Sequence, residues 1–219
     1  MEDMDYLKRF SGKVAHDFNN VLTGVLGFAQ LILMDMGKDD KFYEDVKQIE
    51  NAAKKGRAFT DQLLLFSQKR PLAKKDEDVN DIIKDSLEEV RDMVKKDVVI
   101  TTDLNKAPFL NLDGERIGQA LKGVIMNSNE AIDSGGEIRL STAVSDEGKN
   151  VLISVEDDGK GATPKDLPFI FEPFYKTEKM RENGVGLTIA YEIVKEHGGQ
   201  IEALLREGGG MIFKMRFPV

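Results

Sequence analysis

Two long series of apolar residues at helical spacing occupy the first 66 positions of the chain. In each series, apolar side chains recur at steps of three and four residues, and the polar stretch DMGKDDK separates the two. The first series is Leu7, Phe10, Val14, Phe18, Val21, Val25, Phe28 and Ile32, and the second is Phe42, Val46, Ile49, Ala53, Gly56, Phe59, Leu63 and Phe66. This periodicity predicts two amphipathic helices joined as an antiparallel hairpin.

A hairpin of two such helices cannot enclose a core by itself, because each apolar face has only one partner helix to cover it. Pairing two hairpins completes a four-helix bundle. We therefore expect a homodimer formed through the helical hairpin. The alternative is that the hairpin packs on the rest of its own chain.

The sequence changes character after residue 70. The stretch QKRPLAKKDEDVN is charged and contains proline, which is typical of a linker. We expect a helical hairpin over residues 1–70, a linker over 71–79 and a second domain over 80–219. In the second domain, helical patterns at 81–94, 115–132 and 187–197 alternate with strand patterns at VVITTDL, FLNL, EIRLSTAV, VLISVED, QIEALL and MIFKMRF. The chain is thus expected to be multi-domain, α followed by α+β, with an α/β sandwich whose sheet is covered on one side.

Composition removes several classes of function. A net charge of −8 and a pI near 5.0 argue against a nucleic-acid partner, which requires clustered lysine and arginine. The absence of cysteine excludes disulfides, thiolate metal sites and thiol catalysis, and it fits a cytoplasmic location. No apolar run approaches the roughly 18 to 20 residues that cross a bilayer, and MEDMDY lacks the layout of a signal peptide. Any membrane attachment is expected only through segments absent from this chain.

His16 is one of only two histidines in the chain. Because each helical residue advances about 100°, His16 lies roughly 170° from the apolar face of its helix and faces solvent. Asn20 follows one turn later, and Asp17 lies beside His16. An exposed imidazole can attack through one ring nitrogen if a carboxylate such as Asp17 accepts a hydrogen bond from the other. An ordinary surface histidine remains the alternative, whereas a metal site is disfavoured because no second ligand has suitable spacing.

The second domain lacks the phosphate-binding loop G-x-x-x-x-G-K-[ST], yet it offers other nucleotide-binding features. Asp157 ends a strand pattern before a glycine-containing turn, where a buried carboxylate could accept a hydrogen bond from an adenine amino group. Asn127 offers a neutral oxygen to Mg²⁺, which favours oxygen ligands. Glycines precede the helix that begins at Leu187, and a helix N-terminus is a natural phosphate site. Each of these signals is unspecific when taken alone.

The order of these segments resembles the catalytic core of the sensor histidine kinases of bacterial two-component systems, and the resemblance covers nearly the whole chain. The N-terminal segment FSGKVAHDFNNVLTGVLGFAQLIL resembles the H-box of the dimerization and histidine phosphotransfer domain. Four further segments resemble the N-box, first glycine box, F-box and second glycine box of the ATP-binding domain shared with gyrase, Hsp90 and MutL. They are QALKGVIMNSNEAI, DDGKG, FIFEPFYK and GVGLTIAYEIVKEHGG.

The resemblance implies a role for each matching residue. In the N-terminal domain it implies that His16 accepts the phosphoryl group, that Asp17 assists proton removal and that Asn20 takes part in dephosphorylating the partner. In the ATP-binding domain it implies that Asn127 binds Mg²⁺ and Asp157 binds adenine. The remaining ATP-binding positions are Gly159 and Gly161 in the first glycine box, Gly184, Gly186 and Leu187 in the second, and Lys176 in the lid, with Phe171 and Phe174 at the lid's base.

The chain departs from the family pattern at three places. Gly123 stands where the family usually has asparagine, Glu182 stands where it has glycine, and the stretch 174–184 is about one residue short. Weaker ATP binding or lid closure would follow. In the same stretch, Lys176, Lys179 and Arg181 could contact phosphates, although a solvated charge run is the commoner explanation.

The resemblance implies a kinase that autophosphorylates His16 from ATP with Mg²⁺ and passes the phosphoryl group to an aspartate of a response-regulator receiver domain. Dephosphorylation of that partner is also expected. Two alternatives stay open at this point. One is a phosphatase or phosphotransfer scaffold with a degenerate ATP site, and the other is an Hsp90-like or MutL-like ATPase, which would leave the hairpin bearing His16 without a role.

Overall fold

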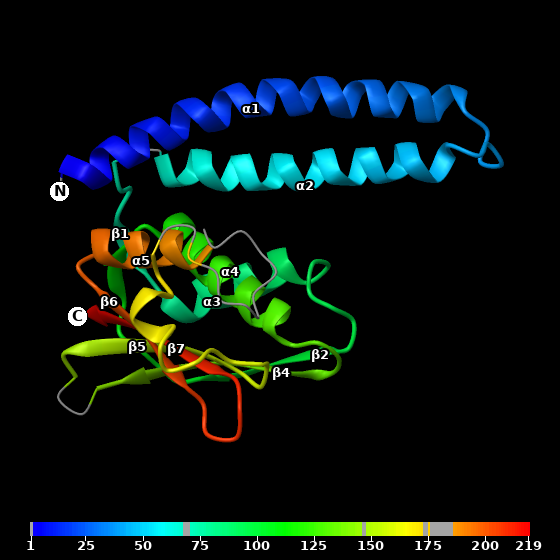
Figure 1. The fold of residues 1–219 in the computed structure, drawn as a ribbon. Helices are drawn as coiled ribbons and strands as arrows, with labels where there is room; N and C mark the ends of the chain where they lie inside the picture. Colours follow the sequence, from blue (N-terminus) through cyan, green and yellow to red (C-terminus); the bar gives the residue numbers. More distant parts are fainter. Residues whose placement is uncertain (1, 68–70, 146–147, 173–174, 176–185) are drawn as a thin grey trace. The chain divides into compact units, whose positions relative to one another are not determined.

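The computed structural model describes the chain except for residues 1, 68–70, 146–147, 173–174 and 176–185. The chain divides into two compact units, Met1–Arg70 and Pro71–Val219. The first is helical, and the second combines helices with a mixed sheet. The predicted fold class, a helical hairpin followed by an α/β sandwich, is confirmed (Figure 1).

Two antiparallel helices, α1 (Glu2–Asp35) and α2 (Tyr43–Ser67), form the first unit, as the periodicity predicted. The connection between them is closed by local hydrogen bonds, including one from the Phe42 amide to the Asp40 carboxylate at 2.9 Å. Among the hairpin side chains that the structure describes, the buried ones are small or polar. They are Ser11, Ala15 and Ala29 from α1 and Glu50, Ala53 and Thr60 from α2.

The apolar series predicted for α1 is largely exposed within the hairpin. Phe18 is 57% exposed, Val21 64% and Phe28 70%. A single hairpin therefore leaves this apolar face of α1 uncovered, as expected of two helices that have only each other as partners. A large exposed apolar surface of this kind is typical of a protein–protein interface.

Part of α1 also passes a length-and-composition test for membrane spanning, contrary to the sequence-based expectation. The segment Phe10–Asp35 is long and apolar enough to cross a bilayer on these two criteria alone. A single such helix near the N-terminus is weak evidence, because the core helix of a soluble protein and a signal sequence meet the same criteria. The segment also carries charged side chains at Lys13 and Asp17, which are costly in the bilayer interior.

The second unit is built on a five-stranded sheet in the order β2-β4-β5-β7-β6. Helices α3, α4 and α5 lie together on one face of this sheet (Figure 1). The strands are β2 (Val98–Leu104), β4 (Gly136–Val144), β5 (Asn150–Asp157), β6 (Gln200–Leu205) and β7 (Met211–Pro218). The helices are α3 (Val79–Val90), α4 (Gly114–Ala131) and α5 (Gly186–Glu196), with a short 3-10 helix at Leu167–Phe169.

The core of this unit lies between the helices and the covered face of the sheet. Strand β7, which lies between β5 and β6, alternates strictly, and its buried positions are Met211, Phe213, Met215 and Phe217. Alternation of this kind means that one sheet face is packed and the other is open. The pairing of β4 with β5 and of β5 with β7 is antiparallel, whereas β2 pairs with β4 in parallel.

The segment predicted as a linker over residues 71–79 is partly built into the second unit. It contains β1 (Lys75–Glu77), which pairs antiparallel with β3 (Leu110–Leu112) in a separate two-stranded sheet. The Ala73 amide donates to the Asp113 carboxylate at 2.8 Å, and Asp78 caps α3 through a 2.8 Å bond from the Asn80 amide. The linker prediction was therefore too long, because charge and proline content do not reveal strand pairing across 35 residues of sequence.

Candidate functional site

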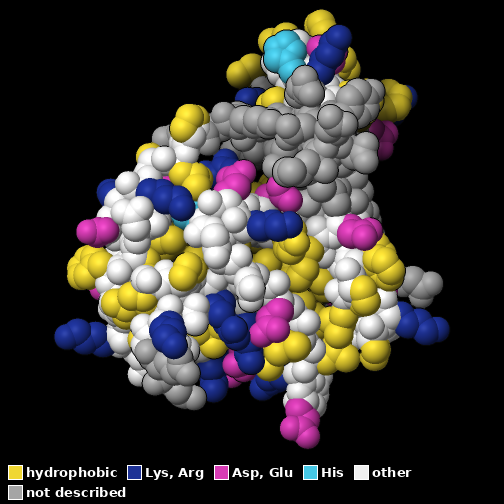
Figure 2. Space-filling view, turned by 90° about the vertical axis from the view of Figure 1, so that its left-hand side faces the viewer, with side chains coloured by type: hydrophobic (Ala, Val, Ile, Leu, Met, Phe, Trp, Pro, Cys, Tyr) yellow, Lys and Arg dark blue, Asp and Glu magenta, His cyan; other side chains and the backbone are white. Residues whose placement is uncertain are grey.

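The first group of predicted site residues lies on the outer surface of α1. The His16 side chain is 70% exposed and that of Asp17 is 67% exposed, and a histidine is visible on the surface of the helical unit in Figure 2. The ring Nδ1 of His16 lies 3.4 Å from the Asp17 Oδ1. An imidazole held through Nδ1 presents Nε2 to solvent, which is the arrangement that a nucleophilic histidine requires.

Two adjacent asparagines of α1 point to different sides of the helix. Asn20 is exposed, one turn after His16. Asn19 is half-buried, and its side-chain oxygen accepts a hydrogen bond from the Thr60 hydroxyl of α2. Asn19 thus fixes the hairpin, whereas Asn20 remains available on the same face as His16 and Asp17.

The second group of predicted site residues centres on Asp157, which ends β5. Its side chain is 1% exposed and accepts three hydrogen bonds, from the Ser128 hydroxyl at 2.9 Å, the Gly159 amide at 3.0 Å and the Met211 amide at 3.3 Å. Burial raises the pKa of Asp157 above its ordinary value, even though these three donors favour the charged form. When it is ionised, a buried carboxylate is a strong hydrogen-bond acceptor for a further donor, such as an exocyclic amine.

The turn after Asp157 brings its backbone against the end of α4. The Lys160 amide donates to the Ala131 carbonyl at 2.9 Å. A side chain at Gly159 would place its Cβ 2.7 Å from the Ala131 backbone, which real structures do not tolerate. Gly161 has a φ of 62°, in the left-handed region that favours glycine. Both glycines are thus required by the turn that holds Asp157 beside α4.

Asn127 lies on α4 near this turn. It lines a cavity of about 20 Å³ together with Gly161, Ile170 and Met211. Its amide has no hydrogen-bond partner among the described residues, which leaves its oxygen available to an external ligand. In the described part of the chain, no cluster of three or more acidic or histidine side chains could hold a metal. Asn127 fits a Mg²⁺ that takes most of its ligands from water and nucleotide phosphates.

The cavity beside Asn127 is far smaller than the roughly 300 Å³ or more that small-molecule pockets usually have. The described residues around Asn127 therefore do not outline a complete nucleotide pocket, and the neighbouring residues 176–185 lie outside the description. The larger cavities of this unit lie elsewhere, along α3 and at the start of β6.

Gly123 of α4 and Gly186 of α5 lie against each other. A Cβ at Gly123 would lie 2.8 Å from the Gly186 carbonyl oxygen. Gly186 begins α5, and Leu187 is 4% exposed and packs in the core. The departure from the family pattern at Gly123 therefore has a structural counterpart, because an asparagine at this position would displace the first turn of α5.

Several predicted site residues lie outside the described residues. They are Lys176 and Gly184, with Phe174, Lys179, Arg181 and Glu182 in the same stretch. Phe171 is described, and its ring centroid lies 5.6 Å from that of Tyr191 on α5.

His197, the second histidine, is a buried structural residue. Its Nδ1 donates to the Ile193 carbonyl at 2.8 Å, and its Nε2 accepts from the Asp113 amide at 3.0 Å. Burial lowers the pKa of His197 from its ordinary value. A buried, neutral ring with both nitrogens occupied joins the end of α5 to the start of α4, which disfavours a second phosphorylation site here.

The sequence-based predictions missed two residues that position the site. Ser128 follows Asn127 directly and holds the Asp157 carboxylate, and Thr60 holds Asn19. Both are buried polar residues inside helical patterns. A small hydroxyl on an otherwise apolar helix face was the available signal, although the sequence does not say which partner it meets.

Two family models match the chain. The model of the His Kinase A (phospho-acceptor) domain matches residues 6–72. The model described as histidine kinase-, DNA gyrase B- and HSP90-like ATPase matches residues 112–219. Together they include His16 and every ATP-binding position discussed above.

Curated relatives align with nearly the whole chain. Sensor kinase CckA of Brucella abortus is 29% identical over 232 residues, with 99% of this chain and 25% of the relative covered. Sensor histidine kinase ZraS of Escherichia coli is 29% identical over 220 residues, with 100% of this chain and 47% of the relative covered. The chain thus spans about a quarter to a half of the length of these relatives.

Solved structures share the fold. ShkA, crystallised with AMPPNP, has a TM-score of 0.76 at 22% identity, with 95% of this chain and 45% of that chain covered. Histidine kinase ThkA in complex with response regulator protein TrrA has a TM-score of 0.70 at 24% identity, with 99% and 63% covered. Both likenesses concern the fold.

Proposed function

The chain belongs to the histidine kinase family, and on that premise we propose that it phosphorylates its own His16 from ATP and passes the phosphoryl group to an aspartate of a response regulator. The observation that carries the proposal is the pairing of two sites in one chain. One is an exposed imidazole with a carboxylate beside it. The other is a buried carboxylate at a glycine turn, near an asparagine amide that has no hydrogen-bond partner among the described residues.

In the proposed reaction, the free Nε2 of His16 attacks the γ-phosphorus of ATP in line. A nitrogen–phosphorus bond forms, the bond from phosphorus to the bridging oxygen breaks, and ADP leaves with that electron pair. Asp17 accepts a hydrogen bond from Nδ1 and stabilises the positive charge that develops on the ring. The imidazole proton then passes to solvent, since both side chains are exposed.

The second unit would bind and orient the nucleotide. Asp157 would accept a hydrogen bond from the adenine amino group, and the Gly159 and Gly161 turn lets the backbone approach the base. Asn127 would provide a protein oxygen to Mg²⁺, which neutralises phosphate charge in such reactions. Binding and orientation of this kind supply most of the catalysis in phosphoryl transfer.

We further propose that the chain acts as a homodimer through α1 and α2. Support comes from the exposed apolar stripe of α1, which includes Phe18, Val21 and Phe28. A second hairpin would cover this stripe and complete a four-helix bundle. This role also accounts for the apolar character of α1 without placing it in a membrane, and it is compatible with a cytoplasmic location, where ATP is available.

The response-regulator partner is proposed from the family and from the exposed face that carries His16 and Asn20. ThkA, which shares this fold, has been crystallised with a response regulator protein. A docked receiver domain would bring its aspartate to phosphorylated His16, and Asn20 could orient a water for the reverse hydrolysis of the aspartyl phosphate.

The test is incubation of the folded chain with γ-labelled ATP and Mg²⁺, followed by addition of an unlabelled receiver domain. We expect a label on the chain that is stable to alkali and lost in acid, and that moves to the receiver. His16→Gln and Asp157→Asn should each abolish or strongly reduce it. A label that is stable in acid, or a label that persists in His16→Gln, would refute the proposal.

A phosphatase or phosphotransfer scaffold is the second candidate, and the departures from the family pattern at Gly123 and in the stretch 174–184 favour it. Calorimetry with millimolar Mg-ATP separates the two. A scaffold would show no binding heat and no label, yet it would still dephosphorylate a phosphorylated receiver.

A further inference from the structure

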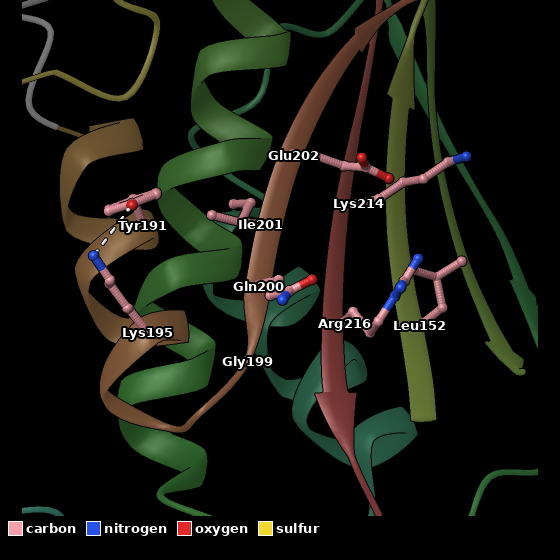
Figure 3. Close-up of a pocket in the computed structure, with 9 residues that line it drawn as sticks. All are labelled: Leu152, Tyr191, Lys195, Gly199, Gln200, Ile201, Glu202, Lys214 and Arg216. Carbon is pink, nitrogen blue, oxygen red and sulfur yellow. Dashed lines mark hydrogen bonds between the residues drawn. The ribbon is translucent and has the colours of Figure 1, made fainter. Parts of the chain in front are cut away.

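A groove between α3 and β2 lies apart from the residues of the proposed nucleotide site. It has a volume of about 600 Å³, and neither Asn127 nor Asp157 lines it. The cavity at the start of β6 does not bring its charges together, since Lys214 and Arg216 lie on one side of β6 and Lys195 of α5 lies on the other (Figure 3). The groove, by contrast, has two walls that face the same space.

One wall of the groove is a stripe of α3, and the other is one face of β2. The helix wall follows steps of three and four residues and so lies on one side of the helix: Lys84, Leu87, Glu88 and the C-cap residue Arg91. The strand wall consists of alternate residues, which share a face of the sheet: Val98, Ile100, Thr102 and Leu104. That face is the one covered by helices, because Ile100 pairs with the fully buried Ile138 of β4.

The floor of the groove is apolar and incompletely covered. Leu87, Val94, Ile100 and Leu104 line it, and each is only half-buried. Helix α3 therefore does not close over the strand at this edge of the sheet. An apolar side chain from outside would gain burial by entering here.

Strand β2 ends the five-stranded sheet. Its residues Val98–Leu104 pair in register with β4, which is its neighbour in the described part of the chain. Along its other edge, the backbone N–H and C=O groups that point away from β4 are available to a further strand. An extended peptide laid along this edge would pair with these groups, and every second side chain would enter the groove.

Cations stand at both ends of the helix wall. Lys84 and Arg91 are seven residues apart, about 10 Å along the helix, with Leu87 between them. Lys84 pairs with Asp81 at 2.8 Å and Arg91 with Glu88 at 3.5 Å, and all four side chains are exposed. Exposed pairs of this kind contribute little to stability, so both cations can exchange their partner for another carboxylate.

The turn after α3 adds two lysines to the lining of the groove. Lys96 makes no ion pair in the described part of the chain, and the Lys95 ammonium donates to the neutral Ile132 carbonyl. The neighbouring carboxylate of Asp97 accepts from the Gly135 amide at 2.8 Å. The groove is thus rich in positive charge, although the whole chain has a net charge of −8.

We propose that this groove binds an extended acidic segment of a partner protein, added as a further strand beside β2. The face of the segment toward α3 would carry an apolar residue between two acidic ones. The acidic residues are then four positions apart, about 13 Å in a strand, which their side chains can adjust to the spacing of Lys84 and Arg91. The central apolar residue would pack on Leu87 and Ile100, where a carboxylate would meet Glu88.

The charge of the groove selects this occupant. A second copy of the chain would bring the same cations together across two β2 edges, which is unfavourable. An acidic strand instead satisfies the backbone edge, the apolar floor and the cations at the same time.

The probe is the capped peptide Ac-TETVTET-NH₂, which places Glu, Val and Glu on one face of a strand. Titration into the full chain, followed by amide resonances in a TROSY spectrum, should give saturable shifts in α3 and β2. The peptide Ac-TQTVTQT-NH₂ should bind about tenfold more weakly, because it lacks both charged contacts.

Methylation of the peptide's own backbone amides tests strand addition itself. In a strand, alternate N–H groups point to the same neighbour. One peptide methylated at its odd positions and another methylated at its even positions should therefore differ, with binding lost in one and kept in the other. Equal binding of the two would overturn the pairing with β2.

Two pairs of variants locate the contact on the protein. Thr102→Glu places a carboxylate in the groove and should weaken binding by about tenfold, whereas Val99→Glu places it on the other face of the same strand and should change binding by about twofold or less. Both positions are exposed, so the fold should tolerate both changes. Arg91→Gln should likewise weaken binding, and Lys165→Gln, at an exposed position that does not line the groove, should not.

Three results would overturn the proposal: no saturable shift at millimolar peptide, equal affinity for the glutamine peptide, or equal losses in Thr102→Glu and Val99→Glu. Shifts in β2 that depend on protein concentration without peptide would also overturn it, since a second copy would then occupy the edge. None of these measurements uses ATP, so the result does not depend on the proposed kinase activity.

Discussion

Replacement of Asp157 by asparagine separates the ligand-binding role of this residue from its role in the fold. Asparagine has nearly the same shape. Its side-chain oxygen can accept from the Gly159 and Met211 amides, which now donate to Asp157 at 3.0 and 3.3 Å, and its amide can donate to the Ser128 hydroxyl. The local structure should therefore persist. The adenine amine, however, would meet either the weaker, neutral oxygen of the asparagine or its NH₂ group, which is a donor.

The expected size of the effect follows from the loss of one hydrogen bond to a charged acceptor. Such bonds contribute about 1.5–3 kcal/mol, so Mg-ATP affinity should fall by about one to two orders of magnitude. The stability of the folded protein, in contrast, should stay the same or increase in this variant. Because burial raises the pKa of Asp157 in the folded protein, ionisation costs more there than in the unfolded chain. The parent thus loses stability as pH rises from the ordinary carboxyl range through the raised pKa, and the asparagine variant does not.

Calorimetric titration with Mg-ATP and thermal unfolding at several pH values measure both effects. Asp103→Asn is the matched control, since Asp103 is an exposed carboxylate on β2. We expect weak ATP binding with an unchanged or higher unfolding temperature near neutral pH for Asp157→Asn, and parental behaviour for the control. ATP affinity within about twofold of the parent, with both proteins folded, would refute the assigned role.

Three further predictions test other parts of the account. Gly123→Ala should lower the unfolding temperature by several degrees, with a cost of about 1–3 kcal/mol from overpacking against the Gly186 carbonyl, whereas Gly24→Ala, which has nothing within 4 Å, should not. The parent should lose stability as pH falls from about 6.5 through the lowered pKa of His197, and this slope should diminish in His197→Gln, measured by thermal unfolding. Asn20→Ala should keep the phosphoryl label on the chain but slow dephosphorylation of the receiver by about a hundredfold. The release of inorganic phosphate measures this rate.

The regular elements of the second unit could be predicted from the sequence because their patterns are local. Alternation in MIFKMRF and helical spacing around Asn127 both place their residues correctly in β7 and α4. Asp157 at a strand end before a glycine turn was predictable for the same reason. The need for glycine at position 159 depends instead on Ala131, because a Cβ at 159 would lie 2.7 Å from the Ala131 backbone.

The features that the sequence did not reveal depend on long-range contacts. Periodicity identified the apolar face of α1, but it did not show which α1 residues meet α2. Ala15 and Ala29 are buried within the hairpin, and Leu22 lies against Gly56 of α2. In the same way, the pairing of β1 with β3 and the hydrogen bond from Ser128 to Asp157 join segments 29 or more residues apart, which no local window contains.

The most direct test of the central claim is the location of the phosphoryl group after incubation with Mg-ATP. Mass spectrometry under alkaline conditions, which preserve phosphohistidine, should find the added phosphoryl on the peptide that contains His16 and on no other. In His16→Gln that mass shift should be absent, although Mg-ATP still binds. A phosphoryl group on another residue, or none on a folded chain that binds Mg-ATP, would contradict the account.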